Sequence, residues 1–136
     1  MQIFCSTGGF KLPPENVVDN FSKAGIRNIE LSGGVHSPSS FDKLFRYSTN
    51  NCLQLHNYFP PPEKSFVLNL ASTDDSILAA SKDLCKKAID WSSKFGAKRY
   101  SFHAGFLVDP RPSELGGVLS SARLTERQLA IEIFVN

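Results

Sequence analysis

The sequence predicts an α/β protein of parallel (β/α) repeats, about four units, which make half of a TIM (β/α)8 barrel. Short β-prone segments alternate with helical segments along the chain, as in parallel strands joined by crossover helices. The strands alternate polar and apolar residues, whereas strands of an open doubly wound sheet are apolar on both faces. Since a closed barrel takes about 250 residues, these 136 residues suit half of one, and 1–136 is treated as a single domain.

The first two repeats are predicted from segments that are punctuated by glycine. Residues 2–7 form a β-prone run before two glycines. Residues 14–25 have apolar residues at helical spacing, with a proline in the first turn and a glycine as the stop. Residues 27–34 are the second strand, and 39–48 form a short helix that starts with serine. These segments make two complete strand–helix units.

The third repeat contains the clearest helix of the chain. Its strand, 51–59, runs into three prolines and a long connection. The helix, 73–96, has a continuous apolar stripe, acidic residues in its first turn and a glycine at its end. Ser72 or Thr73 is the predicted N-cap of this helix.

The fourth repeat is the least regular. Its strand, 99–105, is followed by a stretch with proline and glycine, 109–117. The final helix is predicted over 125–134, because Thr125 and Gln128 have the spacing of a capping box.

Two histidines end neighbouring predicted strands. His56 and His103 both have the parity of the polar face, so their imidazoles are expected to converge at matched heights over the carboxyl ends of the strands. Histidine is the commonest metal ligand near neutral pH, but a catalytic zinc has about three protein ligands. The two residues are therefore either part of a site for a divalent metal, Zn or Mn, or a hydrogen-bonded pair that fills the barrel top.

Four short motifs resemble a known family. The opening "CSTGGF", the second strand "IELSGG", the third "LHNYFPP" and the fourth "YSFHAGF" together resemble the xylose isomerase-like TIM barrel superfamily. That superfamily contains sugar-phosphate isomerases and epimerases and the endonuclease IV group of abasic-site nucleases. The resemblance covers nearly all 136 residues but only the N-terminal half of the family's barrel.

The resemblance implies the N-terminal half of a metal-dependent sugar or sugar-phosphate isomerase or epimerase, inactive as this fragment alone. In the endonuclease IV branch, histidines that end strands three and four bind zinc, so His56 and His103 are the metal ligands that the resemblance transfers. In the isomerase branch, the principal ligands and the catalytic glutamates come from strands five to eight. The catalytic residues are therefore not identified in these four repeats.

Three further residues are candidates for substrate binding. Glu30 has rim parity on the second strand, although an ion pair with Arg99 is an equal alternative. Tyr58 follows the third strand and either lines the pocket or packs on the prolines. Asp109 follows the fourth strand and either reaches the barrel mouth or starts the turn before Pro110.

Composition restricts the partners and the location. The net charge of +2 comes without a basic block, so nucleic acid is an unlikely partner. The small-molecule partner, a sugar or sugar phosphate, is what the resemblance implies. There is no apolar run of membrane-spanning length and no signal peptide pattern, so no membrane is expected. The three cysteines have no C-x-x-C spacing, which fits a reducing, cytoplasmic location.

Two alternatives to the isomerase prediction stay open. One is an endonuclease IV-like zinc phosphodiesterase acting on abasic DNA. The other is a non-catalytic half-barrel that assembles as an oligomer, because four strands leave two unpaired sheet edges. Either self-association or a missing C-terminal half would cover those edges.

Overall fold

The computed structural model of the chain describes residues 2–119 and 124–136, which divide into two compact units. The first unit runs to Glu63 and resumes over Lys86–Phe102. The second unit consists of Lys64–Cys85 and His103–Asn136. That 1–136 behaves as a single domain stays a prediction.

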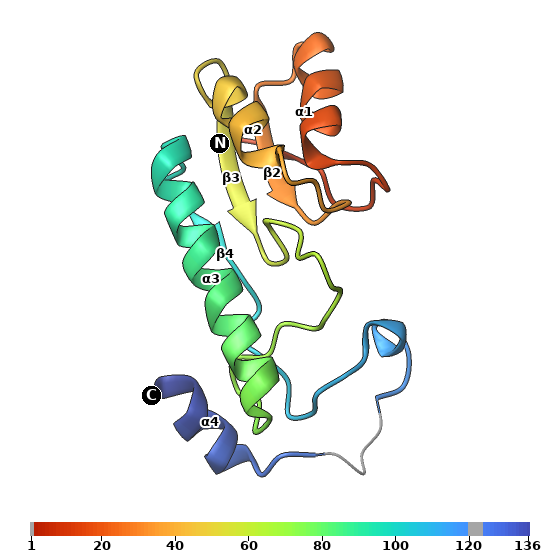
Figure 1. The fold of residues 1–136 in the computed structure, drawn as a ribbon, viewed down its shortest axis with the longest axis vertical. Coiled ribbons are helices and arrows are strands. Elements are labelled where there is room, and N and C mark those ends of the chain that lie inside the picture. The colour runs from red at the N-terminus through yellow and green to blue at the C-terminus, as the bar shows by residue number, and fades with distance from the viewer. Residues whose placement is uncertain (1, 120–123) are drawn as a thin grey trace. The chain divides into compact units, whose positions relative to one another are not determined.

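The first unit contains a four-stranded sheet in which every neighbouring pair is parallel. Its strands are β1 (Cys5–Ser6), β2 (Asn28–Ser32), β3 (Cys52–His56) and β4 (Tyr100–Ser101), in the order β1-β2-β3-β4. Figure 1 labels β2, β3 and β4. The predicted α/β class with four parallel strands is confirmed. The strands are shorter than predicted, and β4 ends two residues before His103.

Three helical segments pack on the apolar face of this sheet. They are α1 (Pro14–Lys23), α2 (Ser40–Ser48) and the part of α3 (Asp75–Phe95) that belongs to the first unit. Figure 1 shows α1 and α2 next to each other, close to β2. The alternation predicted for the second and third strands is confirmed, because the apolar positions of β2 and β3 are buried and the polar ones are not. The core comprises Val18, Ile29, Leu31, Leu44, Leu53, Leu55, Phe59, Ala88 and Phe95.

A buried carboxylate joins α1 to the start of α2. Glu15, in the first turn of α1, is 3% exposed. Its oxygens accept hydrogen bonds from the hydroxyl of Ser40 at 2.6 Å, from the hydroxyl of Ser37 at 2.8 Å and from Lys43 Nζ at 3.3 Å. Burial alone would raise the pKa of Glu15, but the bonds from Ser40, Ser37 and Lys43 lower it below its ordinary value.

The predicted N-caps of the last two helices are wrong by one or two residues. Asp74, rather than Ser72 or Thr73, caps α3, and its Oδ1 accepts from the backbone N–H groups of Ser76 at 2.8 Å and Ile77 at 3.1 Å. A carboxylate at this position also interacts favourably with the helix dipole. Bonds from the Ser76 hydroxyl and from these two N–H groups lower the pKa of Asp74.

The helix α4 (Arg127–Val135) has a similar carboxylate cap. Glu126 Oε2 accepts from the backbone N–H of Leu129 at 2.9 Å, which is the role predicted for Thr125. The backbone N–H of Thr125 instead donates to the carbonyl of Leu107 at 2.6 Å. A short 3-10 helix, Pro112–Glu114, was not predicted from the sequence.

The second unit is organised around one buried amide. Asn69, 1% exposed, accepts at Oδ1 from the backbone N–H groups of Ala71 and Phe106. Its Nδ2 donates to the carbonyls of Phe106 and Val108 and to Asp109 Oδ1. A Cβ added at Gly105 would overlap Asn69 Oδ1, so this glycine allows the two chain segments to approach. Asn69 thereby fixes the connection after β3 to the segment after β4.

Candidate functional site

Polar side chains gather at the carboxyl ends of the first three strands. The register places Ser6 of β1 opposite Glu30 of β2, and Ser32 of β2 opposite His56 of β3. Paired residues of parallel strands point to the same face, so all four side chains lie on the face away from the helices. We call Ser6, Glu30, Ser32 and His56 the rim cluster. Glu30 and His56 each keep 30% of their side-chain surface exposed, so a ligand can reach them.

The imidazole of His56 is the centre of the rim cluster. Its Nδ1 lies 3.3 Å from Ser32 Oγ and 3.6 Å from Glu30 Oε1. The hydroxyl is within hydrogen-bond distance of Nδ1, whereas the carboxylate oxygen lies just beyond it. A carboxylate and a hydroxyl on one side of the ring therefore fix its orientation.

The backbone around the cluster is held by Thr7, which is buried. Its N–H donates to the carbonyl of Glu30 at 2.8 Å, and its Oγ1 accepts from the N–H of Ser32 at 2.9 Å. The next residue, Gly8, donates its N–H to Ser6 Oγ at 3.2 Å. A Cβ at Gly8 would lie 3.3 Å from Ser6 Oγ and 3.4 Å from Ser32 Oγ, so a glycine here leaves both hydroxyls uncrowded.

Two members of the cluster were not among the predicted site residues. Ser6 and Ser32 join the site because the strand register brings them beside Glu30 and His56. Their only sequence signal is that each occupies the polar parity of its strand immediately before a glycine-containing turn. That signal also fits an ordinary tight turn.

The predicted equal height of the two histidines is wrong. The strand register pairs His56 with Ser101, and His103 follows β4 as an exposed residue of the second unit. The sequence extended the fourth strand to His103, two residues beyond the end of β4 at Ser101. The residue level with His56 is therefore Ser101 and not His103. That His56 and His103 share a metal ion stays a prediction.

The rim cluster contains two donors that suit a divalent cation, the imidazole of His56 and the carboxylate of Glu30. No group of three or more His, Cys, Asp or Glu residues that could hold a metal occurs among residues 2–119 and 124–136. A catalytic zinc has about three protein ligands, so these two donors are at most part of such a site.

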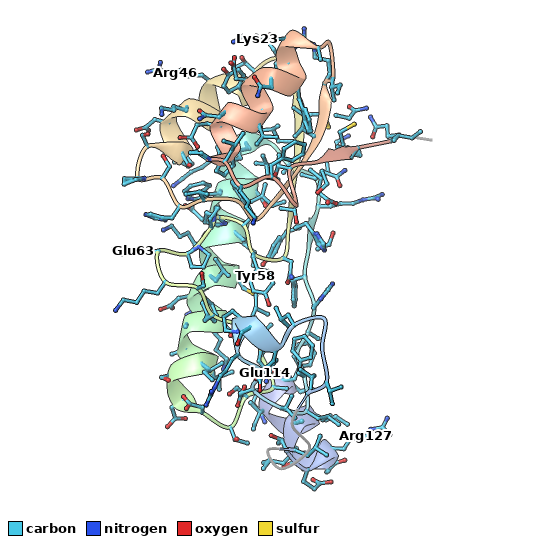
Figure 2. The ribbon with its side chains drawn as sticks, turned by 90° about the vertical axis from the view of Figure 1, so that its right-hand side faces the viewer. Lys23, Arg46, Tyr58, Glu63, Glu114 and Arg127 are labelled. Atoms are coloured by element: carbon cyan, nitrogen blue, oxygen red, sulfur yellow. The ribbon has the colours of Figure 1, made fainter. Side chains whose placement is uncertain are left out.

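Of the three residues predicted to bind substrate, Glu30 belongs to the rim cluster, whereas Tyr58 and Asp109 do not. Glu30 contacts His56 rather than Arg99, because Arg99 precedes β4 and the whole of β3 separates the two strands. Tyr58 is half-buried in the connection after β3 (Figure 2). Asp109 belongs to the second unit and accepts from Asn69 Nδ2 at 2.8 Å, so it contributes to the folding of that unit.

No protein-family model matches the chain, and neither a curated protein nor a solved structure shows significant similarity to it. Within the described ranges, none of the helices combines the length and the apolar character that crossing a membrane requires.

Proposed function

We propose that the chain is the N-terminal half of a (β/α)8 barrel that acts as a metal-dependent sugar or sugar-phosphate isomerase or epimerase. Four parallel strands in sequential order, with apolar residues toward the helices and polar residues on the other face, are what half of such a barrel requires. Barrel enzymes place their active sites at the carboxyl ends of the strands. The observation that carries the proposal is the contact of His56 with Glu30 and Ser32 at that end.

The chemistry of the rim cluster suits a polyhydroxylated substrate. Isomerisation and epimerisation move a proton at a carbon next to a carbonyl, and they need a proton acceptor that is held in position. Glu30 and Ser32 fix the His56 ring, so the ring can hold or transfer a proton at a sugar hydroxyl or at an adjacent carbon. The hydroxyl of Ser6 can orient the same substrate. A divalent cation, Zn or Mn, would supply polarisation of the substrate carbonyl when bound.

A closed barrel needs four further strands, from a C-terminal half or from a second copy of the chain. Edge strands left unpaired invite association. We therefore propose that the chain also self-associates. Its mass in solution, measured by sedimentation or light scattering, tests this.

Binding of sugars to the chain tests the substrate class. We expect D-ribulose 5-phosphate or D-xylose, titrated with Mn²⁺ present, to bind in the millimolar range by calorimetry. His56→Gln should weaken this binding about tenfold, the effect of losing one hydrogen bond to a polar ligand. The matched control is His36→Gln, the same change in an exposed loop histidine whose ring contacts the carbonyl of Pro61.

Two results would contradict the proposal. The first is sugar binding that His56→Gln leaves unchanged. The second is an absence of sugar binding together with tight binding of a duplex that contains an abasic site, which would favour the endonuclease IV-like alternative.

A further inference from the structure

A second polar hollow lies at the opposite, amino-terminal end of the sheet in the first unit. It has a volume of about 390 Å³ and is lined by Gln2, Phe4, Cys52, Gln54, Lys98 and Arg99. Cys52 is the first residue of β3 and Gln54 lies two residues further along, so both belong to the polar face. We propose that this amino-end hollow binds a small oxyanion, either inorganic phosphate or the phosphate group of a phosphomonoester.

The charge of the lining carries the proposal. Lys98 and Arg99 are both cationic, and the lining contains no aspartate or glutamate. Within residues 2–119 and 124–136, neither Lys98 nor Arg99 forms an ion pair, whereas Lys23, Lys43 and Lys94 do. An arginine guanidinium presents a planar fork of donors that matches two oxygens of an oxyanion, and a lysine adds a point charge.

The amides in the lining are suitable uncharged donors. Gln54 is the direct register partner of Glu30, which lies on the neighbouring strand β2. The carboxylate of Glu30 lies 3.6 Å from His56 Nδ1, and His56 is on the carboxyl-terminal side of Gln54. Glu30 is thus engaged with the rim cluster, while Gln54 and Gln2 can donate their side-chain N–H groups to an anion in the hollow.

Cys52 provides a reporter inside the hollow. Its thiol is exposed, whereas Cys85 is buried and Cys5 is half-buried. A bound anion should shield Cys52, and the cationic lining should attract an anionic thiol reagent more strongly than a neutral one. The ratio of the two labelling rates at Cys52, resolved from the other cysteines by peptide mass spectrometry, therefore measures the local charge.

The experiment compares a dianionic aromatic disulfide with neutral dithiodipyridine at low ionic strength. In the unmodified chain, the anionic reagent should be favoured, and millimolar inorganic phosphate should slow its reaction with Cys52 at least fivefold. The double variant Lys98→Gln/Arg99→Gln should lose both effects. The control Lys82→Gln/Lys86→Gln removes the same net charge from exposed positions of α3 that do not line the hollow, and it should keep both.

Glycerol 3-phosphate in place of inorganic phosphate distinguishes the two sources of the anion, because the better ligand protects Cys52 at lower concentration. A phosphate titration of the unmodified chain tests anion binding without a variant. The amide resonances of residues 52, 54, 98 and 99 should shift as phosphate is added. Equal behaviour of the two double variants, or no protection and no shifts with either phosphate compound, would overturn the proposal.

Discussion

Replacing Asn69 by alanine is expected to lower the free energy of unfolding by about 3 kcal/mol, because the buried backbone groups it serves would lose their partners. The change leaves the N–H groups of Ala71 and Phe106 without their acceptor, and the carbonyl of Val108 without its donor. Urea denaturation followed by circular dichroism measures the loss. Hydrogen exchange should show the largest increase in the second unit.

The matched control for this prediction is Asn20→Ala, the same substitution at an exposed position of α1. It is expected to change stability by at most about 0.5 kcal/mol. Asn69→Asp gives a second check, because it places a carboxylate beside Asp109 Oδ1 and should therefore destabilise more at pH 7 than at pH 4. A stability loss at Asn69→Ala as small as that at Asn20→Ala would show that the buried amide does not organise the second unit.

Replacing Glu15 by glutamine is expected to cost about 2 kcal/mol at pH 7, the range for hydrogen bonds to a buried charged group. The folded-state pKa of Glu15 is lower than its unfolded value, chiefly because Ser40 and Ser37 outweigh the effect of burial. Its stabilisation is therefore fully present above the ordinary carboxyl pKa and is lost as the pH falls through the lowered one. The unmodified chain and Glu15→Gln should converge in stability on acidification.

Unfolding free energies measured between pH 7 and pH 3 test this prediction. The control is Glu63→Gln, the same change in an exposed loop glutamate (Figure 2). This control should keep the pH dependence of the unmodified chain. A difference between Glu15→Gln and the unmodified chain that stays constant over this range would contradict the proposed role of the Glu15 carboxylate.

The parallel sheet and its two faces could be predicted from the sequence because they follow from local alternation. Ile29 and Leu31, and likewise Leu53 and Leu55, are spaced so that burying one buries the other, and the residues between them take the opposite face. The position of Glu30 and His56 on the polar face follows from the same rule. This part of the site needed no knowledge of long-range contacts.

Some of the remaining features depend on contacts between distant segments, and the helix caps depend on a choice between neighbouring residues. The end of β4 at Ser101 depends on pairing with β3, so the sequence alone extended that strand to His103 and placed it level with His56. In the sequence, Asn69 is one polar residue in the connection after β3. Its structural role comes from hydrogen bonds to residues almost forty positions later in the chain. The carboxylate caps Asp74 and Glu126 were missed because neighbouring serine and threonine residues have the same preference for helix starts.

The central claim, that the rim cluster is the binding site of a metal-dependent barrel enzyme, is tested most directly by paramagnetic broadening. Mn²⁺ added to the isotopically labelled chain should broaden the amide resonances of residues 6–8, 30–32 and 55–57 before others. The broadening should disappear in the double variant His56→Ala/His103→Ala, while the melting transition is largely retained. Rim resonances that stay sharp while other regions broaden, or equal broadening in the double variant, would contradict the account.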